Sequence, residues 1–148
     1  MSQPNMLKSF IFVFVQFACL GLIAVTGPLI PENVLLLTVE LLGLVIGVWA
    51  VLTMGLGNFN ITPDPLASSR LVTKGLYSLI RHPMYLALLL VTLPLVIADF
   101  TWVRMAIWLT LLVDLLLKLN YEEDLLAARL KGYDEYKQKS YRLIPFIY

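Results

Sequence analysis

Two long apolar runs near the N-terminus are the feature that most constrains how this chain folds. The first extends from about residue 7 to residue 30, and the second from about residue 34 to residue 54. A helix of about 20 apolar residues is long enough to cross the roughly 30 Å hydrocarbon core of a bilayer. The segment between the runs carries two prolines and a glycine, and Asn33 is well suited to cap the second helix. The sequence therefore predicts two membrane-spanning helices joined by a short turn.

Two further apolar runs occupy residues 83–98 and 102–119. Pro83 suits the first turn of a helix, because its backbone angle is fixed near the helical value. Of the 148 residues, 59% are hydrophobic and only 14% are charged, whereas soluble domains have about 45–50% and about 25%. We therefore predict an all-α integral membrane protein, with residues 1–148 forming a single domain that contains four transmembrane helices.

The polar parts of the chain are residues 55–80 and residues 120–148. Clusters of Gly, Asn, Pro and Ser in the first segment are typical of an irregular loop. In the second segment, Leu126, Leu130 and Tyr133 recur at spacings of four and three residues. This spacing predicts a C-terminal amphipathic helix that packs one apolar stripe.

The basic residues predict the orientation of the spans. Every Lys and Arg except Arg104 lies at the N-terminal end of the first run, between the second and third runs, or from residue 118 onwards. Cytoplasmic segments of membrane proteins are enriched in these residues. We therefore expect a multi-pass protein with both termini, the 55–80 loop and the tail helix in the cytoplasm.

Charge and metal-binding residue types argue against several classes of function. The net charge is only +1, and the basic residues are dispersed, so no nucleic-acid partner is predicted. Cys19 is the single cysteine and His82 the single histidine. One residue of each kind does not predict a cysteine- or histidine-based metal site.

Two polar clusters stand out as candidates for chemistry. A hairpin of the last two spans would place two segments, residues 81–85 and residues 121–124, at the same membrane face. The first cluster offers a cation, an imidazole and the free N–H groups of a helix N-terminus, all suited to an anion. The second offers adjacent carboxylates suited to an ammonium, a sulfonium or ribose hydroxyls. S-adenosylmethionine carries all of these groups, but any zwitterionic headgroup would satisfy the same match. Taken singly, residues of the first kind are more often an interfacial anchor, and those of the second kind are more often the solvated first turn of a surface helix.

The motifs together resemble the isoprenylcysteine carboxyl methyltransferase family, whose wider group includes membrane phospholipid methyltransferases. The resemblance covers roughly residues 55 to 148 and rests on the run from Leu71 to Tyr77, on Arg81-His82-Pro83-Met84-Tyr85, on Glu122-Glu123 and on a tail with Tyr133, Tyr136, Arg142 and Ile144-Pro145-Phe146. It implies a methyltransferase that uses S-adenosylmethionine, with a pocket enclosed by the last two spans and the C-terminal segment. Its acceptor would be a lipophilic or lipidated molecule that arrives through the membrane lipid.

The resemblance also implies roles for individual residues. His82, Pro83 and Tyr85 would contact the cofactor, and Glu122 would hold its polar groups. Arg81, Glu123 and Arg142 would act on the acceptor or on closure of the pocket, and are the residues we expect to be catalytic. These roles follow from motif position alone, and the resemblance implies no metal.

One position departs from the family pattern, and two other functions stay open. Ala87 stands where the family commonly has glycine, and its methyl group is expected to narrow the cofactor's approach. The alternatives are a nicotinamide-dependent membrane reductase and a non-enzymatic binding or assembly protein on the same scaffold. Prenylcysteine carboxylate, lipid amine and lipophilic thiol acceptors all remain open.

Overall fold

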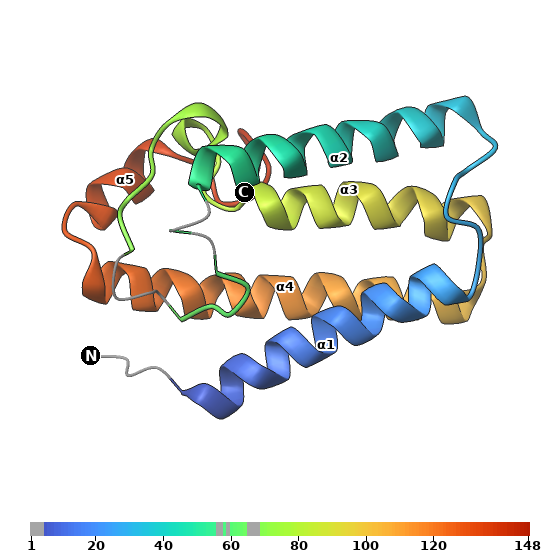
Figure 1. Cartoon of the computed structure of the whole chain (residues 1–148), viewed down its shortest axis with the longest axis horizontal. Helices are drawn as coiled ribbons and strands as arrows, with labels where there is room; N and C mark the ends of the chain where they lie inside the picture. Colours follow the sequence, from blue (N-terminus) through green and yellow to red (C-terminus); the bar gives the residue numbers. More distant parts are fainter. Residues whose placement is uncertain (1–4, 56–57, 59, 65–68) are drawn as a thin grey trace.

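The protein is a bundle of helices (Figure 1). The computed structural model describes residues 5–55, 58, 60–64 and 69–148. Parts of the predicted 55–80 loop, at residues 56, 57, 59 and 65–68, lie outside this description. The helices within the described ranges are α1 (Met6–Val25), α2 (Val34–Met54), the 3₁₀ helix η1 (Gly75–Ser78), α3 (Pro83–Ala98), α4 (Trp102–Arg129) and α5 (Tyr133–Lys139).

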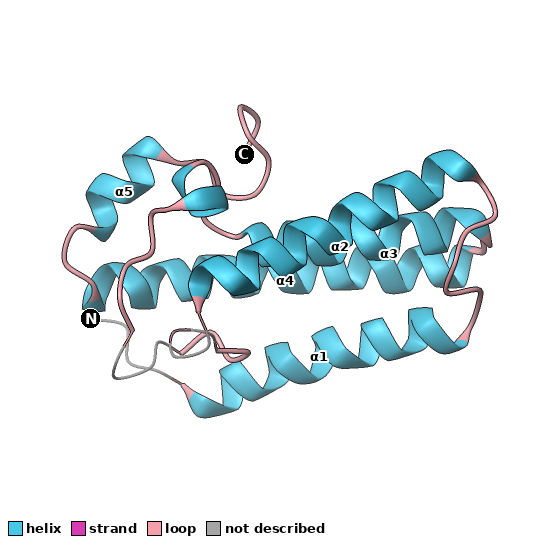
Figure 2. Cartoon of the chain, turned by 45° about the horizontal axis from the view of Figure 1, so that its top comes forward, coloured by secondary structure: helices cyan, strands magenta, loops and turns pink. Residues whose placement is uncertain are grey.

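The four long helices lie side by side in two pairs. α2 packs mainly on α3, and α1 packs mainly on α4. Short turns join α1 to α2 and α3 to α4 at one end of the bundle, which we call the turn end. The other end, which we call the loop end, carries η1, α5 and the C-terminal segment (Figures 1 and 2). In the described ranges there are no strands, and a single parallel bridge joins Ile80 to Tyr141.

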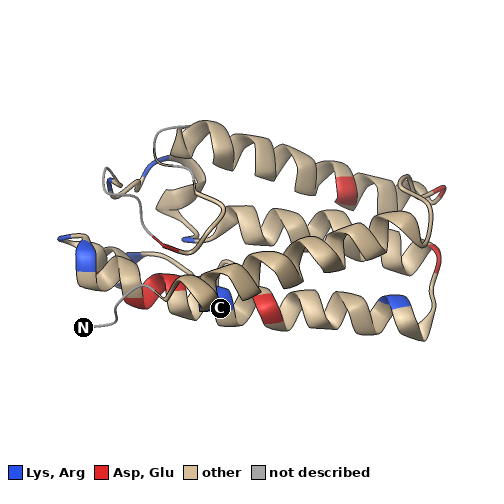
Figure 3. Ribbon diagram, turned by 60° about the horizontal axis from the view of Figure 1, so that its bottom comes forward, with Lys and Arg blue, Asp and Glu red and all other residues tan. Residues whose placement is uncertain are grey.

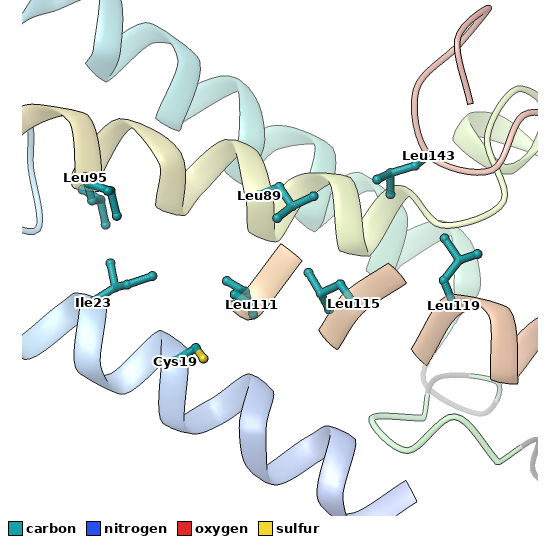
Figure 4. Packing of buried hydrophobic residues seen from close by; sticks show 9 residues of the cluster. Cys19, Ile23, Leu89, Leu95, Leu111, Leu115, Leu119 and Leu143 are labelled. Carbon is teal, nitrogen blue, oxygen red and sulfur yellow. The ribbon is translucent and has the colours of Figure 1, made fainter. Parts of the chain in front are cut away.

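Buried aliphatic side chains from three helices form the core. Ile23 and Cys19 of α1 face Leu89 and Leu95 of α3, with Leu111, Leu115 and Leu119 of α4 completing the cluster (Figure 4). Leu143 from the C-terminal segment joins the same cluster at the loop end. The core therefore attaches the C-terminal segment to the loop end of the bundle.

The outer faces of α1 and α2 are strongly apolar. Large hydrophobic side chains such as Phe14 and Phe17 of α1 and Val45 and Trp49 of α2 are about half exposed or more. These two helices are also long and apolar enough to cross a membrane. A continuous apolar exterior of this kind fits a hydrocarbon environment better than water.

The third and fourth predicted spans are less complete. α3 is apolar but has only 16 residues. At 1.5 Å per residue it is about 24 Å long, which is shorter than the roughly 30 Å hydrocarbon core. The first eighteen residues of α4 include the charged side chains Arg104, Asp114 and Lys118. Four spans therefore remain a prediction, with α1 and α2 as the two candidate spans.

Helix boundaries follow the local signals in the sequence at some ends and depart from them at others. Asn33 caps α2 through its side chain, which accepts hydrogen bonds from Leu35 and Leu36 N–H, and Pro83 occupies the first turn of α3. α1 ends at Val25, five residues before the end of its apolar run, because the Gly27-Pro28 pair disfavours helical geometry.

The predicted separate tail helix is wrong in its position. α4 does not stop at residue 119 but continues to Arg129, and the seven-residue α5 then starts after Gly132, whose φ is 83°. The reason is that Tyr121 and Leu125 continue the buried face of α4 beyond the apolar run. Glu122 and Glu123 therefore sit inside a long helix and not in a solvated first turn.

Arg104 closes the turn end of the bundle. Its guanidinium is buried and donates to the carbonyl oxygens of Ile23 (3.2 Å) and Leu95 (2.8 Å) and to the hydroxyl of Thr26 (2.9 Å). Both carbonyls belong to the last turns of helices, where backbone acceptors lack helical partners and the helix dipole favours a cation. Most of the remaining basic residues gather at the loop end, as Figure 3 shows.

Candidate functional site

The candidate site is built at the loop end, where the start of α3 meets the C-terminal segment. The N–H of Arg81 donates to the carbonyl of Tyr141 at 2.8 Å, and the N–H of His82 donates to the carbonyl of Arg142 at 3.1 Å. Pro83 follows as the first residue of α3 and has no backbone N–H that would need an acceptor. This pairing fixes two segments that are about 60 residues apart in sequence.

Glu123 of α4 is the centre of an ion cluster. Its side chain is 1% exposed and lies within 4 Å of four basic side chains: Arg81 Nε (2.6 Å), Arg142 Nε (3.3 Å), His82 Nε2 (3.4 Å) and Lys137 Nζ (3.8 Å). Burial by itself would raise the pKa of Glu123, but the nearby imidazole of His82 and the hydrogen-bonded guanidinium of Arg81 outweigh it and lower the pKa to about 2. Glu123 is therefore a stable anion that holds this cluster together.

Arg81 is engaged almost entirely within the protein. Besides its bond to Glu123, its Nη1 donates to the carbonyl of Lys137 at 3.0 Å, to the carbonyl of Ser140 and to the Ser140 hydroxyl at 3.3 Å. These carbonyls lie at the end of α5, where helical partners are lacking. Arg81 thereby ties α4, α5 and the C-terminal segment to the start of α3.

His82, Tyr85 and Glu122 form a second group, which shares His82 with the ion cluster. The Tyr85 hydroxyl donates to Glu122 Oε2 at 2.6 Å, and His82 Nδ1 lies 3.8 Å from the same oxygen. The imidazole of His82 is stacked on the Tyr85 ring, with centroids 5.3 Å apart and planes 12° apart. Glu122 remains 26% exposed, so its carboxylate has acceptor positions left for a ligand.

A cavity opens beside these groups. It measures about 110 Å³ and is lined by parts of the 55–80 loop, η1, the start of α3, α4 and α5. Arg81, His82, Pro83, Tyr85 and Glu122 all contribute to its lining. Five of the seven residues expected to form the site are thus brought together at one cavity.

Unpaired polar atoms are concentrated at this cavity. Asp64 Oδ1, Tyr77 OH, His82 Nε2 and Tyr133 OH are shielded from solvent and have no hydrogen-bond partner among the described protein groups. All four side chains line the cavity. The 3.4 Å contact from His82 Nε2 to Glu123 Oε1 does not have the geometry of an aligned hydrogen bond. Since buried polar groups are normally paired, this concentration fits a pocket that receives a polar ligand.

The two other expected site residues lie behind the cavity. Glu123 and Arg142 meet in the ion cluster, and Arg142 Nη1 also donates to the Tyr148 hydroxyl at 2.9 Å. Neither is among the described residues that line the cavity. About a third of the Arg142 side chain is exposed, so it is accessible from outside the cluster.

The expectation for Ala87 is corrected by its position. Ala87 is buried and faces α2, where a β-carbon added to Gly47 would lie 3.3 Å from the Ala87 Cβ. It is not among the described residues that line the cavity. Its methyl group therefore fills the α2–α3 contact and does not narrow the approach to the site.

Several groups at the site were not identified from the sequence. The Tyr77 and Tyr133 residues belonged to recognised motifs, but nothing in a sequence indicates that their hydroxyls lack partners. Lys118, in α4, is 1% exposed and donates to Gln16 Oε1 (2.7 Å) and to the Ile61 carbonyl (2.9 Å), beside loop residues that line the cavity. The sequence did contain one indication of a role for Lys118, its position inside an apolar run, since an ionisable residue in a membrane span is a functional candidate.

Comparison with known families identifies the scaffold. The profile of the isoprenylcysteine carboxyl methyltransferase family matches residues 34–128, which include α2, α3 and nearly all of α4. Comparison with individually curated proteins finds no match. The family is one of membrane methyltransferases, in agreement with the two apolar helices. With the matched segment extending over more than half of its residues, the chain belongs to the isoprenylcysteine carboxyl methyltransferase family.

Proposed function

We propose that this protein transfers a methyl group from S-adenosylmethionine to a lipophilic acceptor at the cytoplasmic face of a membrane. The observation that carries the proposal is the cavity at the start of α3, where His82, Tyr85 and Glu122 meet beside unpaired buried polar atoms. Family membership supports the same reaction class and gives no preference to a nicotinamide-dependent reductase or a non-enzymatic scaffold.

The residues at the cavity fit the polar groups of this methyl donor. Glu122 has free acceptor positions suited to its ammonium or ribose hydroxyls. His82 and the first turn of α3, which begins at Pro83, suit its carboxylate, because a helix N-terminus attracts anions. The cavity volume of about 110 Å³ is below the roughly 300–1,000 Å³ usual for ligand pockets. Binding therefore requires the lining to open, or part of the ligand to lie outside the cavity.

The proposed chemistry needs alignment more than acid or base help. When bound, the methyl donor supplies an electrophilic methyl group, which a lone pair of the acceptor takes while the C–S bonding pair returns to sulfur. The protein's task is to hold donor and acceptor in line, a contribution that reaches about 7–11 kcal/mol in favourable cases. His82, Tyr85 and Glu122 are held for this task by their mutual contacts and by α3 and α4.

The ion cluster suggests how the acceptor is received. Arg81, Arg142 and Lys137 place three positive charges around the carboxylate of Glu123, which leaves excess positive charge within this cluster. The low pKa of Glu123 makes it a poor proton acceptor, so an organising role fits it better than that of a base. The guanidinium of Arg81 already donates hydrogen bonds to Lys137 and Ser140. The partly exposed Arg142 is therefore the cation best suited to an acceptor carboxylate.

Calorimetry on the purified protein in detergent tests the proposal. We expect binding of S-adenosylmethionine and of its demethylated product, and none of a nicotinamide dinucleotide. Glu122→Gln should weaken S-adenosylmethionine binding by about 1–3 kcal/mol, because a charge-assisted hydrogen bond is lost. Asp124→Asn is the matched control, since Asp124 is an exposed carboxylate two residues further along α4.

Radiolabelled S-adenosylmethionine added to membranes that contain the protein would identify the acceptor class. Label in a lipid or lipidated-peptide fraction supports the proposal. Binding of the nicotinamide dinucleotide alone would instead support the reductase, and binding of neither cofactor would support the scaffold.

A further inference from the structure

Residues 143–148, which we call the C-terminal turn, hold two large apolar side chains away from the protein. The N–H of Leu143 donates to the main-chain oxygen of Tyr148 at 2.9 Å, which closes the turn. The side chain of Leu143 is buried in the core, so the turn is fixed at its base. Phe146 is nevertheless 80% exposed and Ile147 79% exposed. A fixed turn thus presents two side chains that the described parts of the protein leave uncovered.

The backbone of Phe146 is in an unfavourable conformation. Its φ is 65°, and among the described residues it alone has a positive φ without being a glycine. This left-handed region is disfavoured for a bulky side chain, whereas glycine adopts it without strain. The ring of Phe146 packs only loosely inside the protein, with its centroid 5.1 Å from that of Tyr141. Packing within the chain therefore does not account for a large apolar residue here, and a partner outside the chain does.

The level of the C-terminal turn along the bundle is set by the start of α3. The carbonyls of Tyr141 and Arg142, directly before the turn, accept the N–H groups of Arg81 and His82, directly before α3. Figure 2 shows the turn projecting sideways from the bundle near the start of α3, whereas α5 lies further out along the bundle axis. The apolar exterior of the bundle reaches the same end, where Leu52 in the last turn of α2 is 74% exposed. The turn therefore emerges where the apolar exterior gives way to the polar loop end.

We propose that the C-terminal turn is a membrane anchor, in which Phe146 and Ile147 insert between the headgroups and acyl chains of the leaflet at the loop end. Large apolar and aromatic side chains bind at this boundary, and an adjoining arginine and tyrosine suit the headgroup layer above it. Arg142 and Tyr148 stand in that place, both partly exposed. Two side chains on one short turn present far less than the roughly 1,000 Å² of a stable protein interface, so lipid is the favoured occupant.

The anchor adds a lipid contact to a tail that the sequence places in the cytoplasm. It does not depend on the proposed methyl transfer. It does connect the bilayer surface to the ion cluster, because Arg142 Nη1 donates to the Tyr148 hydroxyl at 2.9 Å and Arg142 Nε lies 3.3 Å from Glu123 Oε2.

Spin labels on single cysteines measure the depth of the turn in phospholipid nanodiscs that hold one copy of the full chain. In a Cys19→Ala background, nitroxides are placed by Phe146→Cys and, separately, by Ile147→Cys, which keeps Phe146. Gln138→Cys, exposed on α5, is the aqueous reference, and Val45→Cys, 61% exposed on the middle of α2, is the hydrocarbon reference. Collisions with oxygen, which concentrates in hydrocarbon, are compared with collisions with a water-soluble nickel chelate. We expect the oxygen-to-nickel ratio at both turn positions to exceed that at Gln138 by about fourfold or more, as for side chains about 5–10 Å into the interface.

A ratio at both turn positions equal to that at Gln138 would place the turn in water and overturn the inference. Low accessibility to oxygen and nickel alike would also overturn it, because the turn would then be covered by protein. An aqueous ratio at Val45 would remove α2 from the membrane and the inference with it. Since none of these measurements involves a methyl donor, their outcome is separate from that of the proposed function.

Discussion

At the residue scale, Glu123 is the carboxylate on which the ion cluster of the loop end is centred. Its pKa of about 2 is below the roughly 4.3 of a free glutamate, so the folded state favours the ionised form. Its contribution to the free energy of unfolding is therefore complete above pH ~4.5 and is lost as the pH falls towards 2. The size of the shift corresponds to about 3 kcal/mol at neutral pH.

Glu123→Gln should accordingly lower the Tm most at pH 7 and progressively less as the pH falls from about 5 to about 3. Thermal unfolding in detergent across this range measures the difference. Asp124→Asn, which alters an exposed carboxylate next to Glu123, should follow the wild type at each pH. A Tm difference between Glu123→Gln and wild type that stays constant with pH would contradict the low pKa.

Lys118 gives a second prediction at this scale. Its ammonium pairs with Gln16 of α1 and with the Ile61 carbonyl of the loop, and lies 5.4 Å from the Tyr85 ring centroid. Lys118→Met leaves both oxygens without this donor and should cost about 1–3 kcal/mol for each oxygen left buried and unpaired. In a double-mutant cycle, Lys118→Met with Gln16→Met should cost clearly less than the sum of the single variants. Strict additivity in urea unfolding would show that the pair does not interact.

The sequence predicted which residues gather at the site better than it predicted what they touch. Arg81, His82, Tyr85 and Glu122 were expected to meet because a helical hairpin returns its two ends to the same side. The partners of Arg81 in α5, and the Lys118–Gln16 pair, depend on side-chain packing between helices. No spacing rule contains that information, so these contacts could not be read from the chain.

At the scale of helices, the close contact of α2 with α3 depends on small residues. Gly43, Gly47 and Ala50 form a stripe on α2, and Ala87 of α3 lies against it. A β-carbon on Gly43 would lie 2.9 Å from both the Leu90 Cβ and the Val91 backbone nitrogen. Small residues at this spacing let helix backbones approach closely in membranes.

Gly43→Ala should therefore destabilise the bundle, since overpacking costs typically about 1–3 kcal/mol and the gain in helix propensity is at most about 1 kcal/mol. Gly21→Ala in α1 is the matched control, because nothing lies within 4 Å of the added β-carbon. It should leave the Tm unchanged or raise it. Equal Tm values for the two variants would contradict the close α2–α3 contact.

Helix ends were predictable where a local signal decides them. Asn33 and Pro83 mark the starts of α2 and α3 as expected, because capping and proline geometry act within one turn. The end of α4 was not predictable in this way. In sequence, Glu122 and Glu123 resemble solvated residues. In the structure, Glu122 accepts a hydrogen bond from Tyr85 and Glu123 is buried among basic side chains, so α4 continues through them. The stripe of small residues on α2 is visible in the sequence and is the local feature that could have predicted the close α2–α3 contact.

For the whole molecule, the distribution of charge still predicts the orientation. Arg104 is the exception to the basic loop end, and its burial against helix C-termini explains how a cation is accommodated at the turn end. Labelling of single cysteines with a membrane-impermeant thiol reagent in intact cells tests the topology. Glu32→Cys and Asp99→Cys, both exposed at the turn end, should react, whereas Thr73→Cys and Gln138→Cys should react only after the membrane is permeabilised. The reverse pattern would overturn the proposed cytoplasmic location of the site.

The reach of Arg81 across the sequence has a consequence for biosynthesis. Its partners lie 42 residues later in Glu123 and 59 residues later in Ser140. During translation, α3 and most of α4 are therefore made while this arginine still lacks its partners. The set of contacts that hold Arg81 is complete only when the segment after α5 has left the ribosome. Ligand-binding capacity should thus appear as a late step in the maturation of each newly made molecule, after its apolar helices have entered the membrane.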